Sequence, residues 1–117
     1  MSTTLYGIPN CDTVKKARTW LDANGIPYTF HDFKKAGINE SLIQDWLRDV
    51  TWETLVNRKG TTWRGLADER KAGIIDAPSA AVLMQETPSV IKRPVLQHAG
   101  HTHVGFSDAL YREIFNT

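Results

Sequence analysis

The chain has 117 residues, 41% of them hydrophobic, and fourteen Lys and Arg against thirteen Asp and Glu leave a formal charge of +1. This length fits one compact domain, and the balanced charge argues against nucleic-acid or membrane-surface binding through bulk electrostatics. We expect no signal peptide, because no charged N-terminal region is followed by an apolar run. We also expect no membrane association, because no stretch of about 18 apolar residues occurs. One cysteine excludes an internal disulfide and a thiolate zinc site, so the expected location is a reducing cytoplasm.

The first third of the chain has the pattern of a strand, a helix and a second strand. Residues 3–8 are apolar and β-prone, and from Thr13 apolar residues recur at three- and four-residue spacing. Gly25 stops that helix, and residues 28–33 regain strand character. Two short strands joined by a helix predict a right-handed βαβ unit with parallel strands.

The middle of the chain is predicted to be helical. Asn39 can cap a helix, and residues 51–57 contain a further short helical turn. After a polar stretch, residues 66–75 are predicted to form a helix. The Asp-Ala-Pro sequence that begins at Asp76 then starts another helix, which runs to residue 86.

The end of the chain predicts a hairpin and a last helix. Two short apolar runs flank Ala99-Gly100, and Ser107 can cap the helix that follows. The order is therefore βαβ, a helical block and ββα. It indicates an α/β protein with a thioredoxin-like (glutaredoxin-like) fold and a mixed four-stranded sheet. We expect one domain over residues 1–117, with a helical insertion at about residues 36–90.

The only cysteine, Cys11, lies where the first predicted strand meets the first helix. Unpaired backbone N–H groups and the helix dipole favour a thiolate at such a position. Lys15, one turn further on, can add a positive charge. A lone cysteine can also be a small buried hydrophobe, but Asn10 and Asp12 make this turn a poor place for burial, which favours a reactive thiol.

Two other stretches carry suggestive residues. Arg58 lies in a polar, glycine-containing stretch, and Arg93 directly precedes Pro94 at a predicted strand start. Arginine offers a planar fork of donors to an oxyanion or carboxylate, although a single arginine is often a solvated surface charge. His98, His101 and His103 suggest a metal site, but no third ligand is indicated nearby, and we expect no metal.

Five segments give the chain a family resemblance: "LYGIPNCDTVKKARTWL", "GIPYTFHDF", "VNRKGTTWRGL", "IKRPVL" and "VGFSDALY". With these segments the chain resembles the arsenate reductase (ArsC-like) and Spx family, and within it the YffB-type branch. The resemblance implies that Cys11 is a catalytic nucleophile and that Lys15, Arg58 and Arg93 hold an anion over it. It also implies a cis peptide at Arg93-Pro94, and Asn10 and Pro94 complete the candidate substrate-binding set.

The chain departs from the family pattern at two places. Members of the Spx type carry a second cysteine three residues after the first, where this chain has Val14. Arsenate reductases that rely on glutaredoxin carry another arginine shortly after their Arg-Pro, where this chain reads "VLQHAGHTHV". A local two-cysteine switch is therefore excluded, and arsenate is not the expected substrate.

We accordingly predict an enzyme, a thiol-dependent reductase with no bound cofactor and glutathione as co-substrate. Glutathione or a glutaredoxin-type thiol protein is the expected partner, and we expect a monomer. Two alternatives stay open. One is an Spx-like regulatory protein that binds RNA polymerase, and the other is a glutathione-binding sensor without turnover.

Overall fold

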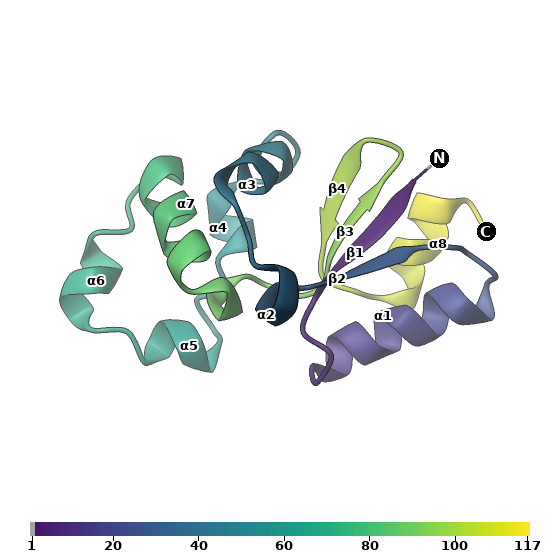
Figure 1. The fold of residues 1–117 in the computed structure, drawn as a ribbon, viewed down its shortest axis with the longest axis horizontal. Coiled ribbons are helices and arrows are strands. Elements are labelled where there is room, and N and C mark those ends of the chain that lie inside the picture. Colours follow the sequence, from purple (N-terminus) through teal and green to yellow (C-terminus); the bar gives the residue numbers. More distant parts are fainter. Residues whose placement is uncertain (1) are drawn as a thin grey trace. The chain divides into compact units, whose positions relative to one another are not determined.

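The computed structural model describes residues 2–117, which divide into two compact units (Figure 1). One unit combines the residues up to Asp32 with Arg93–Thr117, and the other is the contiguous segment Phe33–Lys92. Across residues 2–117, no helix is both long and apolar enough to cross a membrane.

The first unit is built on a four-stranded sheet in the order β2-β1-β3-β4 (Figure 1). The strands are β1 (Thr3–Gly7), β2 (Thr29–Asp32), β3 (Val95–His98) and β4 (His101–Val104). β1 pairs parallel with β2 and antiparallel with β3, and β3 pairs antiparallel with β4. This mixed sheet confirms the thioredoxin-like fold, the predicted βαβ unit and the predicted hairpin.

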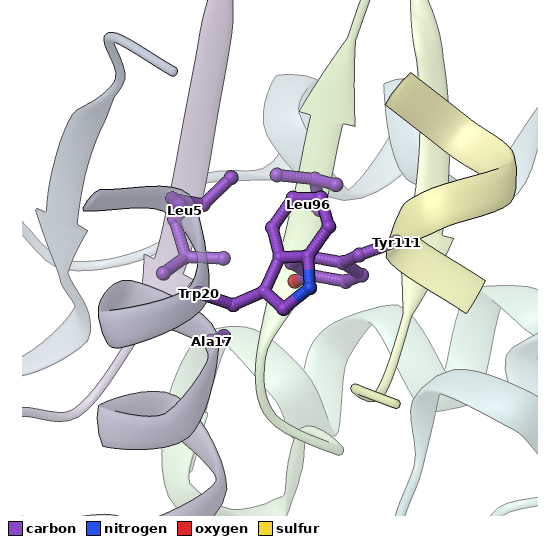
Figure 2. Packing of buried hydrophobic residues seen from close by; sticks show 6 residues of the cluster. Leu5, Ala17, Trp20, Leu96 and Tyr111 are labelled. Atoms are coloured by element: carbon purple, nitrogen blue, oxygen red, sulfur yellow. The ribbon is translucent and has the colours of Figure 1, made fainter. Parts of the chain in front are cut away.

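Helices α1 (Asp12–Ala23) and α8 (Asp108–Phe115) pack on one face of this sheet. Their shared buried cluster is drawn in Figure 2 and consists of Leu5, Ala17, Trp20, Leu21, Leu96 and Tyr111. Trp20 meets Tyr111 edge to face, with the ring centroids 5.4 Å apart, a favoured arrangement for aromatic pairs. The paired residues Leu5 and Leu96 bring the two central strands into this cluster.

Gly7, the last residue of β1, lets α1 approach the sheet closely. A Cβ atom at this position would lie 2.7 Å from Cγ2 of Val14 in the first turn of α1. Val14 is fully buried, and its branched side chain has little freedom to move aside. The absence of a side chain at Gly7 therefore sets where α1 begins relative to β1.

The second unit is helical throughout. Its elements are α2 (Phe33–Ala36), α3 (Glu40–Leu47), α4 (Trp52–Leu55), α5 (Thr61–Arg64), α6 (Asp68–Ala72), α7 (Ala77–Glu86) and the 3-10 turn η1 (Pro88–Val90). Asn39 caps α3 by accepting a hydrogen bond from the N–H of Leu42 at 2.8 Å. Asp76 and Ser79 form a reciprocal capping box at the start of α7. Both caps confirm the helix starts predicted from the sequence.

The helix predicted over residues 66–75 is shorter in the structure. Only Asp68–Ala72 form α6, because the N–H of Leu66 is already bonded to the carbonyl of Trp63 at 3.0 Å. At the other end, the N–H of Gly73 closes the helix on the carbonyls of Glu69 and Arg70. The spacing of apolar and charged residues predicts one helix over residues 66–75, but the backbone hydrogen bonds at both ends limit the helix to its central part.

The polar stretch of residues 58–65 contains a helical turn, α5, that the sequence did not predict. It has no apolar stripe, and none of its residues is fully buried. A tertiary contact accompanies it, because the hydroxyl of Thr62 donates to Ser89 Oγ at 3.2 Å. Such a turn depends on a distant residue, so local periodicity carries no signal for it.

Candidate functional site

Cys11 is the N-cap residue of α1 and follows a turn at Pro9 and Asn10. Its N–H donates to the carbonyl of Ile8 at 3.2 Å, and its own carbonyl accepts from the N–H of Lys15 at 2.9 Å. The side chain is half-buried and is the free thiol of the chain. The thiol therefore lies at the junction of strand and helix that the sequence predicted.

The surroundings of Cys11 favour its thiolate. Burial alone would raise the pKa of the Cys11 thiol, but the N–H groups of Val14 and Thr13 and the side chain of Arg93 outweigh burial and lower that pKa below its ordinary value. The thiol makes no capping hydrogen bond of standard geometry. The backbone contribution is therefore the pull of the N–H dipoles at the helix start on the negative sulfur.

Arg93 reaches Cys11 from the other half of the same unit. The Arg93-Pro94 peptide bond is cis, as predicted, and β3 begins at the next residue. Pro94 is buried, and its carbonyl accepts a hydrogen bond from the N–H of Gly105 at 2.9 Å. The guanidinium of Arg93 acts on Cys11 both as a hydrogen-bond donor and as a charge. A fork of donors beside a thiolate can also hold an anionic group of a substrate.

The rate of Cys11 alkylation by iodoacetamide should show a midpoint pH below that of an ordinary cysteine. The thiolate is the reactive form, and its lowered pKa keeps it populated at pH values where a free thiol is protonated. Reactivity should therefore be lost only as the pH falls through the lowered pKa. Free glutathione, titrated in parallel, is the control. A midpoint equal to or above that of the control would contradict an activated thiol.

Asn10 and Lys15, the two other candidates near the cysteine, are both exposed. Asn10 lies in the turn that precedes Cys11, and the side chain of Lys15 lines a hollow on α1. The groups that lower the Cys11 pKa are Thr13, Val14 and Arg93. Arg93 therefore places a positive charge beside the thiol, while the parts of Asn10 and Lys15 at this site stay predictions.

Arg58 belongs to the helical unit, where its side chain is exposed. Its guanidinium carbon lies 5.8 Å from the ring centroid of Trp52, within the range of a cation–π contact. This contact gives Arg58 a structural partner. Its predicted role in holding an anion stays a prediction.

The three histidines of the hairpin are not grouped as a metal site in the part of the chain that the structure describes. His98 packs against Phe115, with the ring centroids 4.5 Å apart, and its Nδ1 lies 2.8 Å from Oγ1 of Thr3. Over residues 2–117, no group of three or more His, Cys, Asp or Glu side chains is placed to hold a metal ion. His98 is instead part of the packing between the hairpin and α8.

Residues 6–114 match the model of the ArsC family. The chain belongs to the ArsC family. Among solved structures, a protein described as YffB is 46% identical, with a TM-score of 0.91 and coverage of 96% of this chain and 97% of that one. An ArsC-related protein from Brucella melitensis is 50% identical, with a TM-score of 0.76 and coverage of 100% and 97%.

Curated relatives match the chain at different levels of identity. An uncharacterized protein of Haemophilus influenzae is 38% identical over 112 residues, 96% of this chain and 97% of its own length. The global transcriptional regulator Spx of Listeria innocua is 27% identical over 108 residues, 90% of this chain and 80% of its own. The match spans nearly the whole chain, so Cys11 and Arg93 both lie within the family domain.

Proposed function

We propose that this ArsC-family protein is a thiol-dependent reductase in which Cys11 is the nucleophile and glutathione releases the product. The observation that carries the proposal is the contact of Arg93 with a thiol at the start of α1, which lowers the pKa of that thiol. A nucleophilic cysteine needs a populated thiolate and an accessible sulfur. The lowered pKa of Cys11 supports the first requirement, and its half-buried position, outside the sealed core, supports the second.

The reaction follows from thiol–disulfide exchange. The Cys11 thiolate attacks one sulfur of a disulfide substrate, forms a new S–S bond with it and releases the other sulfur as a thiolate. A glutathione thiolate then attacks the Cys11 sulfur of this mixed disulfide, forms a Cys11–glutathione disulfide and releases the substrate sulfur as a second thiolate. A second glutathione thiolate attacks the glutathionyl sulfur, forms glutathione disulfide and releases the Cys11 thiolate. Two electrons pass from two glutathione molecules to the substrate. An external thiol is required, because the buried Val14 stands where a second cysteine would have to lie.

Intact mass spectrometry tests this proposal directly. After incubation with glutathione disulfide, the chain should gain the mass of one glutathionyl group, and reduced glutathione should remove it. Cys11→Ser protein treated in parallel should gain nothing. Wild-type protein that forms no adduct at neutral pH would contradict the proposed nucleophile. An adduct that forms without any turnover of a disulfide substrate would favour a glutathione-binding sensor.

A second candidate function is regulation by binding RNA polymerase, and the Spx relatives favour it. Several of them are 25–27% identical over 90% of this chain. The single cysteine counts against a switch of the two-cysteine type. Retention of RNA polymerase by the immobilised wild-type protein, in proportion to the amount of bound chain, would support the regulator. If the immobilised protein retains no more RNA polymerase than an empty resin does, the reductase remains the favoured function.

A further inference from the structure

A hollow of about 420 Å³ lies on the surface of α1, on the side where the segment after β4 passes. Its lining residues are Lys15, Lys16, Thr19, Trp20, Ala23 and Phe106. The two aromatic rings and Ala23 make the lining mainly apolar, and its two charged side chains are both lysines. The hollow is shallow and open to solvent rather than an enclosed cleft, and its apolar walls with two lysines suit an apolar anionic group that lies along the surface.

Fixed contacts hold the aromatic walls of this hollow. Trp20 is nearly buried in the core cluster (Figure 2), and its Nε1–H donates to Asp108 Oδ1 at 2.8 Å. Phe106 meets Tyr111 edge to face, with the ring centroids 4.7 Å apart. Arg112 bonds the other oxygen of Asp108 at 2.6 Å and offsets its charge. The walls are therefore formed before any ligand arrives, which reduces the entropy that binding must overcome.

Both walls lead back to the reactive thiol. α1 starts next to Cys11, and Lys15 lies four residues along it, an axial rise of about 6 Å. Phe106 follows Gly105, whose N–H is bonded to the carbonyl of Pro94 beside Arg93. Cys11 itself does not line the hollow, which begins at Lys15, one helical turn further on, and continues along α1 to Ala23. A group attached to a sulfur at Cys11 would therefore enter it at the end formed by Lys15 and Phe106, where an anion would meet the lysines.

We propose that this hollow binds the aromatic or otherwise apolar anionic group of the disulfide that Cys11 attacks. The inference rests on the proposed reductase function and names the class of its substrate. In the reaction, the Cys11 thiolate bonds to the sulfur that carries this group, the disulfide bond breaks, and the second sulfur leaves as a thiolate. Lys15 and Lys16 attract the anion, and Trp20 and Phe106 contact its apolar body.

The hollow can be tested without the thiol by adding 8-anilinonaphthalene-1-sulfonate, an aromatic anion, to Cys11→Ser protein. We expect saturable binding that Ala23→Glu weakens about tenfold or more, because this variant places bulk and negative charge in the hollow. Ala23→Gln, of similar size but uncharged, should weaken binding less. Val82→Glu is the matched control, since Val82 lines a hollow of about 350 Å³ elsewhere that contains both Glu69 and Arg70. All three substitutions are made in the Cys11→Ser protein. The proposal would be overturned if Ala23→Glu left the binding of the fluorescent anion unchanged, or if Val82→Glu abolished it.

Kinetics with two aryl disulfides connect the hollow to the reaction. The measured quantity is the rate of reaction with the dianionic 5,5′-dithiobis(2-nitrobenzoate) divided by the rate with the neutral 4,4′-dithiodipyridine. This ratio should be higher in protein with Cys11 intact and no other change than in Ala23→Glu protein. We expect this rate ratio to fall about fivefold or more in Ala23→Glu and to stay unchanged in Val82→Glu. An unchanged ratio in Ala23→Glu would overturn the proposal. The failure of the reductase function is distinguishable, because Cys11 would then form no glutathione adduct while the fluorescent anion still bound.

Discussion

Cys11→Ser protein is expected to lose all turnover of a disulfide substrate with glutathione and to show only the uncatalysed rate of exchange. A serine hydroxyl keeps its proton at neutral pH unless a general base removes it. The groups that favour the Cys11 thiolate are two backbone N–H groups and a guanidinium, and none of them can accept a proton. The chain has no other cysteine that could take over the reaction.

The control for this variant keeps a thiol in the chain but moves it. Cys11→Ser combined with Ala72→Cys places one cysteine at an exposed position at the end of α6, away from any helix start. This double variant should also be inactive, and its thermal unfolding should resemble that of the wild type. Turnover that persists in Cys11→Ser, or returns in the double variant, would rule out a mechanism based on the position of Cys11.

Arg93→Ala should raise the pKa of the Cys11 thiol toward its ordinary value and weaken the binding of anionic disulfides. The variant removes a hydrogen bond and a positive charge from the thiolate, while the N–H groups of Thr13 and Val14 remain. A hydrogen bond to a charged group contributes about 1.5–3 kcal/mol. We expect kcat/KM for an anionic disulfide to fall by the factor to which this free energy corresponds. Arg93→Lys should recover only part of this loss, because a point charge does not replace a planar fork.

The pH profile of alkylation and kcat/KM should be measured for the same set of variants. Arg48→Ala is the matched control, since Arg48 is an exposed arginine that pairs with Asp45 in the helical unit. Its alkylation midpoint and kcat/KM should equal those of the wild type. An Arg93→Ala midpoint equal to that of the wild type would show that the helix start alone activates Cys11, and our assignment of Arg93 would be wrong.

The elements that the sequence predicted best are those with a local cause. Asn39, Asp76 and Ser107 each mark a helix start, because their side chains accept hydrogen bonds from N–H groups three residues later. The parallel pairing of β1 with β2 follows from the βαβ connection. Elements with a distant cause were missed, such as α5, whose contact with Ser89 has no local sequence pattern.

The buried face of α8 shows the same limit. Apolar residues recur at helical spacing in α8, and three of them, Leu110, Ile114 and Phe115, pack against the core cluster. The fully buried residue of the helix, however, is Tyr111, which meets the ring of Trp20 from α1. Helical periodicity indicates an inward stripe, but which side chain lies deepest depends on the partner helix.

The candidate site was predictable in part. The helix start at Cys11 is a local feature, so the chain itself indicated an activated thiol. The contact of Arg93 with Cys11 joins distant segments, and its prediction came from the family resemblance. The hollow on α1 had no sequence signal, because Trp20 and Phe106 come from separate elements and carry no shared motif.

The discontinuity of the sheet unit has a consequence for the order of events during synthesis. β1 leaves the ribosome first, but its antiparallel partner β3 and Arg93 follow only after the entire contiguous segment Phe33–Lys92. Chains are made at about 5–20 residues per second, so Cys11 is exposed for seconds without the guanidinium that lowers its pKa. A nascent chain therefore carries a thiol closer to an ordinary one, and the Cys11 pKa takes its full lowered value only after β3 and Arg93 have been translated.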